Sequence, residues 1–184
     1  TTNTVILTIV AADSVTNNPT TSEAPSLVQI DVDNENVKFS YSGLAFSDFT
    51  LGSAYEIDSE KILVSGLVLD SDPLPAPEGG NGVETYEEQA VRKLINYRGK
   101  TIIINRRDKS VTFTYDASDN SYPSDAVLDE NSNVVIAETS FIGNAGRVIK
   151  VDTDGNIVWQ ISGGLFSKIN DVRAKFNGDV IVST

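Results

Sequence analysis

Apolar and polar residues alternate with a period of two along much of this 184-residue chain. The alternating runs are short and rich in Val, Ile, Thr, Phe and Tyr, and polar turns containing Asp, Asn or Gly separate them. A period of two places successive side chains on opposite faces of an extended strand. The pattern therefore predicts short antiparallel strands that are joined in hairpins and bury one face.

One type of predicted hairpin occurs three times, over residues 27–48, 101–118 and 148–171. When the three segments are aligned with one extra residue in the turn of the first segment, they share their apolar and aromatic positions. These positions are Ile30, Ile104 and Val151 before the turn, and Phe39, Phe113 and Trp159 after it.

A second type of hairpin alternates with the first, over residues 124–140 and 170–184, with a weaker copy over 52–66. Asp125 aligns with Asp171, which lies 46 residues further along the chain. The alternation predicts about four strands per period of this length, which is close to the period of a β-propeller blade.

The most regular copy carries a family resemblance. Asp-Gly-Asn-Ile-Val-Trp at 154–159, Asn-Asp-Val-Arg at 170–173 and Asn-Gly-Asp-Val-Ile-Val-Ser at 177–183 resemble a blade of the NHL-type or quinoprotein-like β-propellers. The resemblance is good over 124–184 and weaker over 27–118. It implies an all-β fold, a propeller-like array of about three four-stranded antiparallel sheets. Because such repeats occur in enzymes, ligand binders and scaffolds, it implies no particular function.

Two segments depart from the repeat. An insertion over about 70–97 begins with a loop rich in Pro and Gly, and residues 84–97 have the spacing of a short amphipathic helix, with Thr85 and Glu88 forming a capping box. This helix would either cover the sheets or dock a partner. Residues 1–26 form an N-terminal strand and a linker rich in Thr and Ser, and residues 27–184 form the repeat domain.

The number of repeats raises the question of assembly. Propellers typically have four to eight blades, whereas this chain supplies about three. The chain is then a fragment of a longer propeller, half of a ring, or a subunit of a head-to-tail fibre. The N-terminal strand is either a peripheral strand of its own domain or an arm that adds to another subunit. The candidate assembly residues are Thr4, Val5, Ile6, Leu7 and Ile9 in this strand, and Val180, Ile181 and Val182 near the other end.

Two pairs of aspartates are weak candidates for a calcium site, Asp31 with Asp33 and Asp152 with Asp154. A calcium loop would place its glycine later and end in a bidentate Glu, whereas Asp-Gly and Gly-Asn suit a tight hairpin turn. The copy at 104–109 keeps the apolar frame and lacks both aspartates. A hairpin turn is therefore the preferred interpretation, and no cofactor is expected apart from possible Ca²⁺.

Composition excludes several classes of function. A net charge of -12 opposes nucleic-acid binding, and the absence of His and Cys excludes Ser-His-Asp, thiol and zinc-thiolate chemistry. No apolar run is long enough to span a membrane. Asp and Glu are plentiful, but nothing singles out a glycosidase pair, and EGGNG at 78–82 lacks the Lys of a P-loop.

We therefore expect a non-enzymatic structural subunit that forms a homo-oligomer or filament, by completing half-blades or by adding β-strands between subunits. The chain does not begin with Met, and its N-terminal region is rich in Thr and Ser, from which we expect a secreted protein or one on a cell or virion surface. Two alternatives remain open. They are a fragment of a larger ligand-binding or enzymatic propeller and a calcium-stabilised adhesion module.

Overall fold

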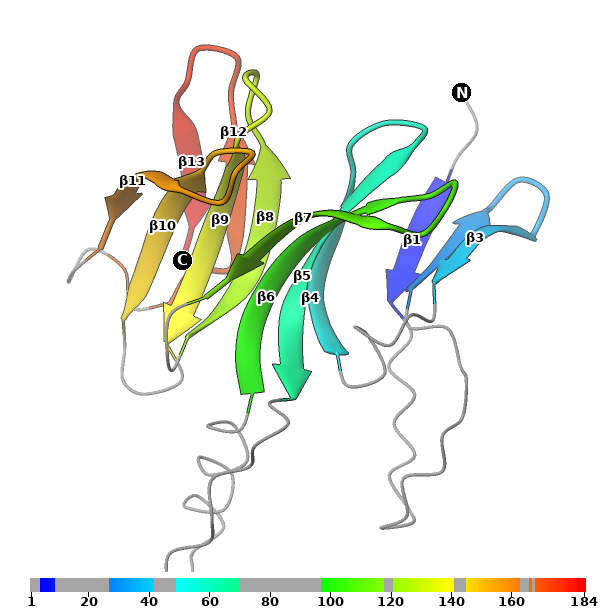
Figure 1. The fold of residues 1–184 in the computed structure, drawn as a ribbon, viewed down its shortest axis with the longest axis horizontal. Coiled ribbons are helices and arrows are strands. Elements are labelled where there is room, and N and C mark those ends of the chain that lie inside the picture. Colours follow the sequence, from blue (N-terminus) through cyan, green and yellow to red (C-terminus); the bar gives the residue numbers. More distant parts are fainter. Residues whose placement is uncertain are drawn as a thin grey trace, which may run out of the picture.

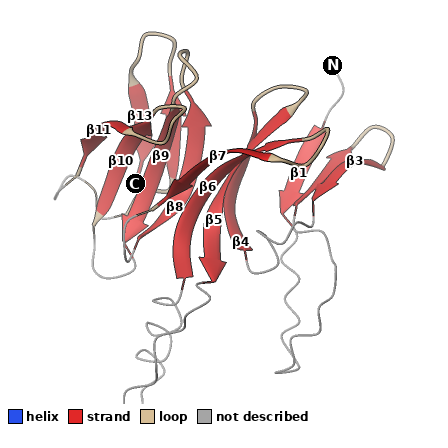
Figure 2. Cartoon of the chain, in the orientation of Figure 1, coloured by secondary structure: helices blue, strands red, loops and turns tan. Residues whose placement is uncertain are grey.

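The computed structural model describes residues 4–8, 27–41, 49–69, 97–117, 121–140, 145–162, 166 and 168–184. In these ranges the chain forms strands, turns and loops and no helix (Figure 2). No helix in this part of the chain is therefore long and apolar enough to cross a membrane. The strands are β1 (Thr4–Thr8), β2 (Leu27–Asp31), β3 (Asn36–Tyr41), β4 (Phe49–Glu56), β5 (Lys61–Leu69), β6 (Tyr97–Asn105), β7 (Val111–Asp116), β8 (Ser121–Leu128), β9 (Val134–Ser140), β10 (Gly146–Val151), β11 (Ile157–Ile161), β12 (Asp171–Ala174) and β13 (Val180–Ser183).

The strands form four antiparallel sheets, in each of which every strand pairs with its neighbour in the sequence (Figure 1). Sheet A is β1-β2-β3, sheet B is β4-β5-β6-β7, sheet C is β8-β9-β10-β11 and sheet D is β12-β13. The predicted fold is confirmed: the protein is all-β, a propeller-like array of antiparallel sheets, of which two have four strands.

Both predicted hairpin types are present. The first type supplies the third and fourth strands of a sheet, as in β6-β7 and β10-β11, and also forms β2-β3. The second type supplies the first and second strands, as β4-β5, β8-β9 and β12-β13. The two hairpin types alternate in the sequence because one forms the first half of a sheet and the other forms its second half.

The insertion and its expected helix fall almost entirely outside the described residues. The exception is Tyr97, expected as the last helical residue, which instead begins β6 and pairs with Leu69. The expected helix is therefore wrong at Tyr97, because the pairing between β5 and β6 extends to this residue. In the N-terminal region, β1 pairs with β2 of its own chain, from Thr4 opposite Asp31 to Thr8 opposite Leu27.

Three apolar clusters hold successive sheets together. Leu27, Phe39 and Tyr41 of sheet A pack against β5 and β6, Phe113 and Tyr115 of sheet B pack against β9 and β10, and Val127, Val135 and Val148 of sheet C pack against sheet D. Alternation along β5 shows how one strand serves two interfaces: Ile62 and Val64 face sheet A, whereas Leu63 faces sheet C. Sheets B and C thus each pack against a neighbouring sheet on both faces.

The first strand of a sheet lies close to its counterparts in neighbouring sheets. β8 contacts β4 on one side and β12 on the other. The approach between sheets B and C is tightest at Gly99 of β6, where a Cβ atom would lie 2.6 Å from Cδ of Pro123 and 2.8 Å from the carbonyl oxygen of Ser121. A side chain at residue 99 is therefore excluded by β8 itself.

Candidate functional site

Sheet D differs from its neighbours because it contains two strands among the described residues. Its turn closes with a hydrogen bond of 2.9 Å from the backbone nitrogen of Lys175 to the carbonyl oxygen of Asp179. Gly178 adopts a φ of 83°, which a residue with a side chain rarely does. The sequence Asn-Gly-Asp at 177–179 thus specifies this hairpin locally.

The outer edge of β13 presents backbone donors and acceptors. Opposite residues of an antiparallel pair alternate between hydrogen-bonded and non-hydrogen-bonded pairs. Val172 donates its N–H to Asp125 rather than to β13, so the pairs of Val172 with Val182 and of Ala174 with Val180 are of the non-bonded type. The N–H and C=O groups of Val180 and Val182 therefore point away from β12. In sheets B and C, β6 and β10 occupy this edge, whereas in sheet D no described strand does.

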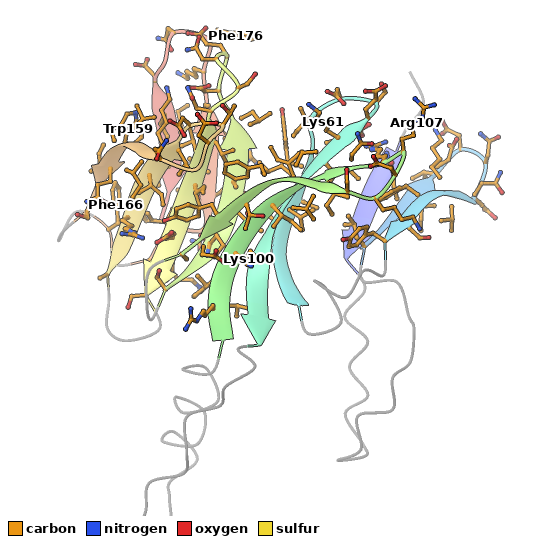
Figure 3. The ribbon with its side chains drawn as sticks, viewed as in Figure 1. Lys61, Lys100, Arg107, Trp159, Phe166 and Phe176 are labelled. Atoms are coloured by element: carbon orange, nitrogen blue, oxygen red, sulfur yellow. The ribbon has the colours of Figure 1, made fainter. Side chains whose placement is uncertain are left out.

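One face of sheet D is also partly exposed. Val180 and Val182 pack on sheet C, while Ile181 faces the other way and is 51% exposed. The register makes Ile181 the counterpart of Leu63 and Val135, both of which are buried beneath the next sheet. Phe176, at the tip of the turn, is 91% exposed (Figure 3). Sheet D thus exposes Ile181 at a position that is buried under the next sheet in sheets B and C.

A carboxylate of sheet C anchors the inner edge of sheet D. Oδ2 of the buried Asp125 accepts the N–H of Val172 at 3.0 Å and lies 3.0 Å from Nη1 of Arg173. The same Nη1 atom lies 2.5 Å from Oδ1 of Asp171. A second link joins Thr139 to Ile169, because the Thr139 hydroxyl accepts the Ile169 N–H at 3.2 Å and donates to its carbonyl oxygen at 3.2 Å. These contacts hold β12 at a fixed position on sheet C.

The anchor brings two carboxyl groups, of Asp125 and Asp171, to one guanidinium. Burial raises the pKa of Asp125, and the hydrogen bond with the Asp171 carboxyl raises it further, whereas the hydrogen bond from the Val172 N–H lowers it. Two carboxyl groups close together favour one shared proton or a cation between them. Arg173 supplies the cation, and with a side chain that is 60% exposed it does so from the solvent side.

Each pair of candidate calcium ligands lies in a hairpin turn of the structure. Oδ1 of Asp152 accepts the N–H groups of Asp154 at 3.0 Å and Asn156 at 2.8 Å, and Oδ2 accepts the Asn156 side-chain amide at 3.2 Å. Oδ1 of Asp31 accepts the N–H of Asp33 at 3.1 Å. These are Asx turns, in which the carboxylate closes a hairpin. The hydrogen bonds from Asn156 are the main reason why the pKa of Asp152 lies below its ordinary value.

A shared turn explains why one copy lacks the aspartates. At the same position in sheet B, Oδ1 of Asn105 accepts the N–H of Arg107 at 2.8 Å. An amide oxygen closes this turn as a carboxylate does. In the part of the chain that the structure describes, His, Cys, Asp and Glu side chains form no group of three or more that could hold a metal ion.

The candidate assembly residues lie in two different sheets. Thr4–Leu7 belong to β1 at the edge of sheet A, and Val180–Val182 belong to β13 at the edge of sheet D. The array of sheets B and C separates them (Figure 1). Ile9 lies outside the described residues. Within one chain, the two strands therefore do not meet.

Sequence reasoning missed two sets of polar contacts, one between sheets B and C and one within sheet C. Glu138 is buried and accepts hydrogen bonds from Tyr115 at 2.9 Å, Ser121 at 3.0 Å and Arg147 at 2.6 Å. Burial and the neighbouring Glu138 raise the pKa of Tyr115 far above its ordinary value. Asp129 closes the β8-β9 turn and pairs with Lys150. Since neither set recurs in the other sheets at the same register, the repeat gave no signal for them.

Comparisons with known proteins bear on the fold. No family model matches the chain, and no curated protein does. A crystal structure of a protein of unknown function from Bacteroides caccae is 12% identical with a TM-score of 0.52, and the match covers 86% of this chain and 46% of that one. An acylaminoacyl peptidase from Pyrococcus horikoshii is 12% identical with a TM-score of 0.45, over 81% of this chain and 22% of that one. The chain thus spans less than half the length of either structure, and the first likeness supports the fold alone.

Proposed function

We propose that this protein is a non-enzymatic assembly subunit that binds further copies of itself at sheet D. The observation that carries the proposal is the outer edge of β13, where Val180 and Val182 present backbone N–H and C=O groups to which no described strand pairs. Such an edge is a template for an additional strand. Ile181, whose counterparts in sheets B and C are buried, supplies apolar surface beside it.

Sheet D is suited to this role because it is held in place. Asp125, Thr139 and the apolar cluster beneath Val172 fix the hairpin on sheet C. A preorganised acceptor loses less conformational entropy on binding than a mobile one. An added strand would therefore extend a sheet that is already formed.

The chemistry of the chain supports a structural role. It contains no His and no Cys. The buried Asp125 and Glu138 carboxylates each engage a backbone or side-chain donor of a neighbouring strand or sheet. A secreted or surface location stays a prediction, as does the relationship to NHL-type or quinoprotein-like propellers.

Light scattering across a wide range of concentration tests the proposal. We expect the mass of the purified 184-residue chain to rise with concentration. Ile181→Lys places a charge on the exposed face of sheet D and should keep the chain monomeric. Val111→Lys is the matched control, because Val111 is also an exposed strand residue, at 42%, but lies in sheet B. A mass that stays monomeric at every concentration contradicts the proposal and favours the alternative that a longer polypeptide supplies the missing strands.

A further inference from the structure

We infer that the strand added to β13 is β1 of a second copy, and that it covers Trp159 and Ile161. This inference rests on the proposed function and names the partner surface. It follows from what the third strand does in the neighbouring sheets.

In two interfaces, the third strand of one sheet covers the aromatic residues of the sheet before it. Phe39 and Tyr41 of β3 lie against Ile102 and Ile104 of β6. Phe113 and Tyr115 of β7 lie in the same way against Ile149 and Val151 of β10. All four aromatic side chains are at most 8% exposed. The third strand therefore contributes alternate apolar residues to each interface.

The interface between sheets C and D lacks this contribution among the described residues. Trp159 and Ile161 of β11 are the counterparts of Phe113 and Tyr115. Like Val180 and Val182, Trp159 is half-buried and packs against the apolar cluster between sheets C and D (Figure 3). Ile161, two residues further along the same face, is 46% exposed. A third strand beside β13 would cover both side chains.

The position specifies the chemistry of the incoming strand. It must receive and donate hydrogen bonds at Val180 and Val182, and it must present apolar residues at alternate positions toward β11. A charged residue at those positions would be buried without a partner, at a high cost.

β1 meets these requirements. It is the edge strand of sheet A, and its outer edge has no partner strand in the described ranges. Its sequence, TVILT, is rich in β-branched residues, and residues 1–12 include no Asp, Glu, Lys or Arg. An uncharged strand also avoids the repulsion that an acidic segment would meet on a protein of net charge -12. The five residues of β1 are long enough to pair with the four of β13.

Trp159 provides the readout because it is the only tryptophan of the chain. We expect its emission to move to shorter wavelength as concentration rises, in step with the mass from light scattering. A synthetic peptide of residues 1–12 should produce the same shift in the dilute chain and lower the assembled mass at high concentration. The matched control peptide carries Ile6→Pro, which removes a backbone donor from the strand, and should do neither.

The outcomes separate the inference from the proposed function. Assembly without a change in Trp159 emission overturns the inference and leaves the proposed function standing. Assembly with a shift that the peptide neither reproduces nor competes with overturns β1 as the source. A monomeric chain whose emission the peptide leaves unchanged overturns both.

Discussion

Oδ2 of Asp125 lies 3.0 Å from the backbone nitrogen of Val172, so that a side chain of sheet C occupies a strand edge of sheet D. The two residues are 47 positions apart, about one repeat. The link joins equivalent strands of successive sheets, and Arg173 reinforces it from the exposed side. It is therefore a joint between repeats, and its ionisation should control how firmly the last sheet is held.

Asp125→Asn tests this joint through pH. Burial, followed by the hydrogen bond with Asp171, raises the pKa of Asp125 in the folded protein above its ordinary value of 3.8. The stability that Asp125 contributes is then fully present below the unfolded pKa and is lost as the pH rises through the folded one. The asparagine keeps an acceptor for Val172 and does not titrate. Urea denaturation measures the free energy of unfolding of both proteins. The value for the native protein minus the value for the variant should fall as the pH rises from about 3.8. A difference that does not change with pH would contradict the raised pKa of Asp125.

Asp152 distinguishes a turn from a calcium site. Asp152→Asn should leave the melting temperature nearly unchanged, because Asn105 closes the equivalent turn with an amide oxygen. Asp152→Ala should lower it, because the N–H groups of Asp154 and Asn156 lose their acceptor. Calcium or a chelator should have no effect on the native protein. A calcium-dependent rise in melting temperature that Asp152→Asn abolishes would instead establish the adhesion-module alternative.

Gly99→Ala should loosen the contact between sheets B and C. The new methyl group would lie 2.6 Å from Cδ of Pro123 and 2.8 Å from Cα of Tyr122, so that the backbone of β8 must move. Overpacking of this kind costs about 1–3 kcal/mol of the free energy of unfolding. Gly178→Asn serves as a control, because residue 178 has open space around it and asparagine tolerates a positive φ. Equal, small losses for the two variants would show that β8 yields easily.

The ion pair between the buried Glu138 and the Arg147 side chain, which is 22% exposed, should be destabilising to break and less so to replace by apolar residues. Glu138→Ala leaves Arg147 without its carboxylate and Tyr115 and Ser121 without their acceptor. Removing one member of a buried ion pair costs about 3–5 kcal/mol, whereas apolar replacement of the pair is often nearly neutral. Glu138→Leu combined with Arg147→Met should therefore recover much of the stability that Glu138→Ala loses. Chemical denaturation of the single and double variants measures the coupling, and strictly additive losses would exclude it.

The repeat made most of the fold predictable. Alternation along a strand such as β5 directly encodes which residues face which sheet, and Phe39, Phe113 and Trp159 mark the same strand in three sheets. Asp125 and Asp171, which the sequence aligned, do occupy equivalent positions in β8 and β12; that both carboxylates contact Arg173 was not predicted.

Contacts that occur in one sheet and not in the others could not be predicted from the sequence. Glu138 occurs where sheet B has Gly66, so its partners Tyr115 and Arg147 could be assigned only once the sheets were stacked. Asp31 and Asp152 close hairpin turns, as the sequence around them predicted, but the spacing of acidic residues alone fits both a turn and a calcium site. Which sheet β1 joins was equally open, because an apolar strand pairs wherever an edge is available.

The three apolar clusters between sheets have no residue in common. Among the described residues, each cluster joins two adjacent sheets, which is the arrangement of a one-dimensional series of units with an interface term between each pair. Within the described ranges, sheets A and D each take part in one such interface, whereas sheets B and C take part in two. Duplication or loss of a single unit of about 46 residues would then change the length of the series while leaving every remaining interface intact.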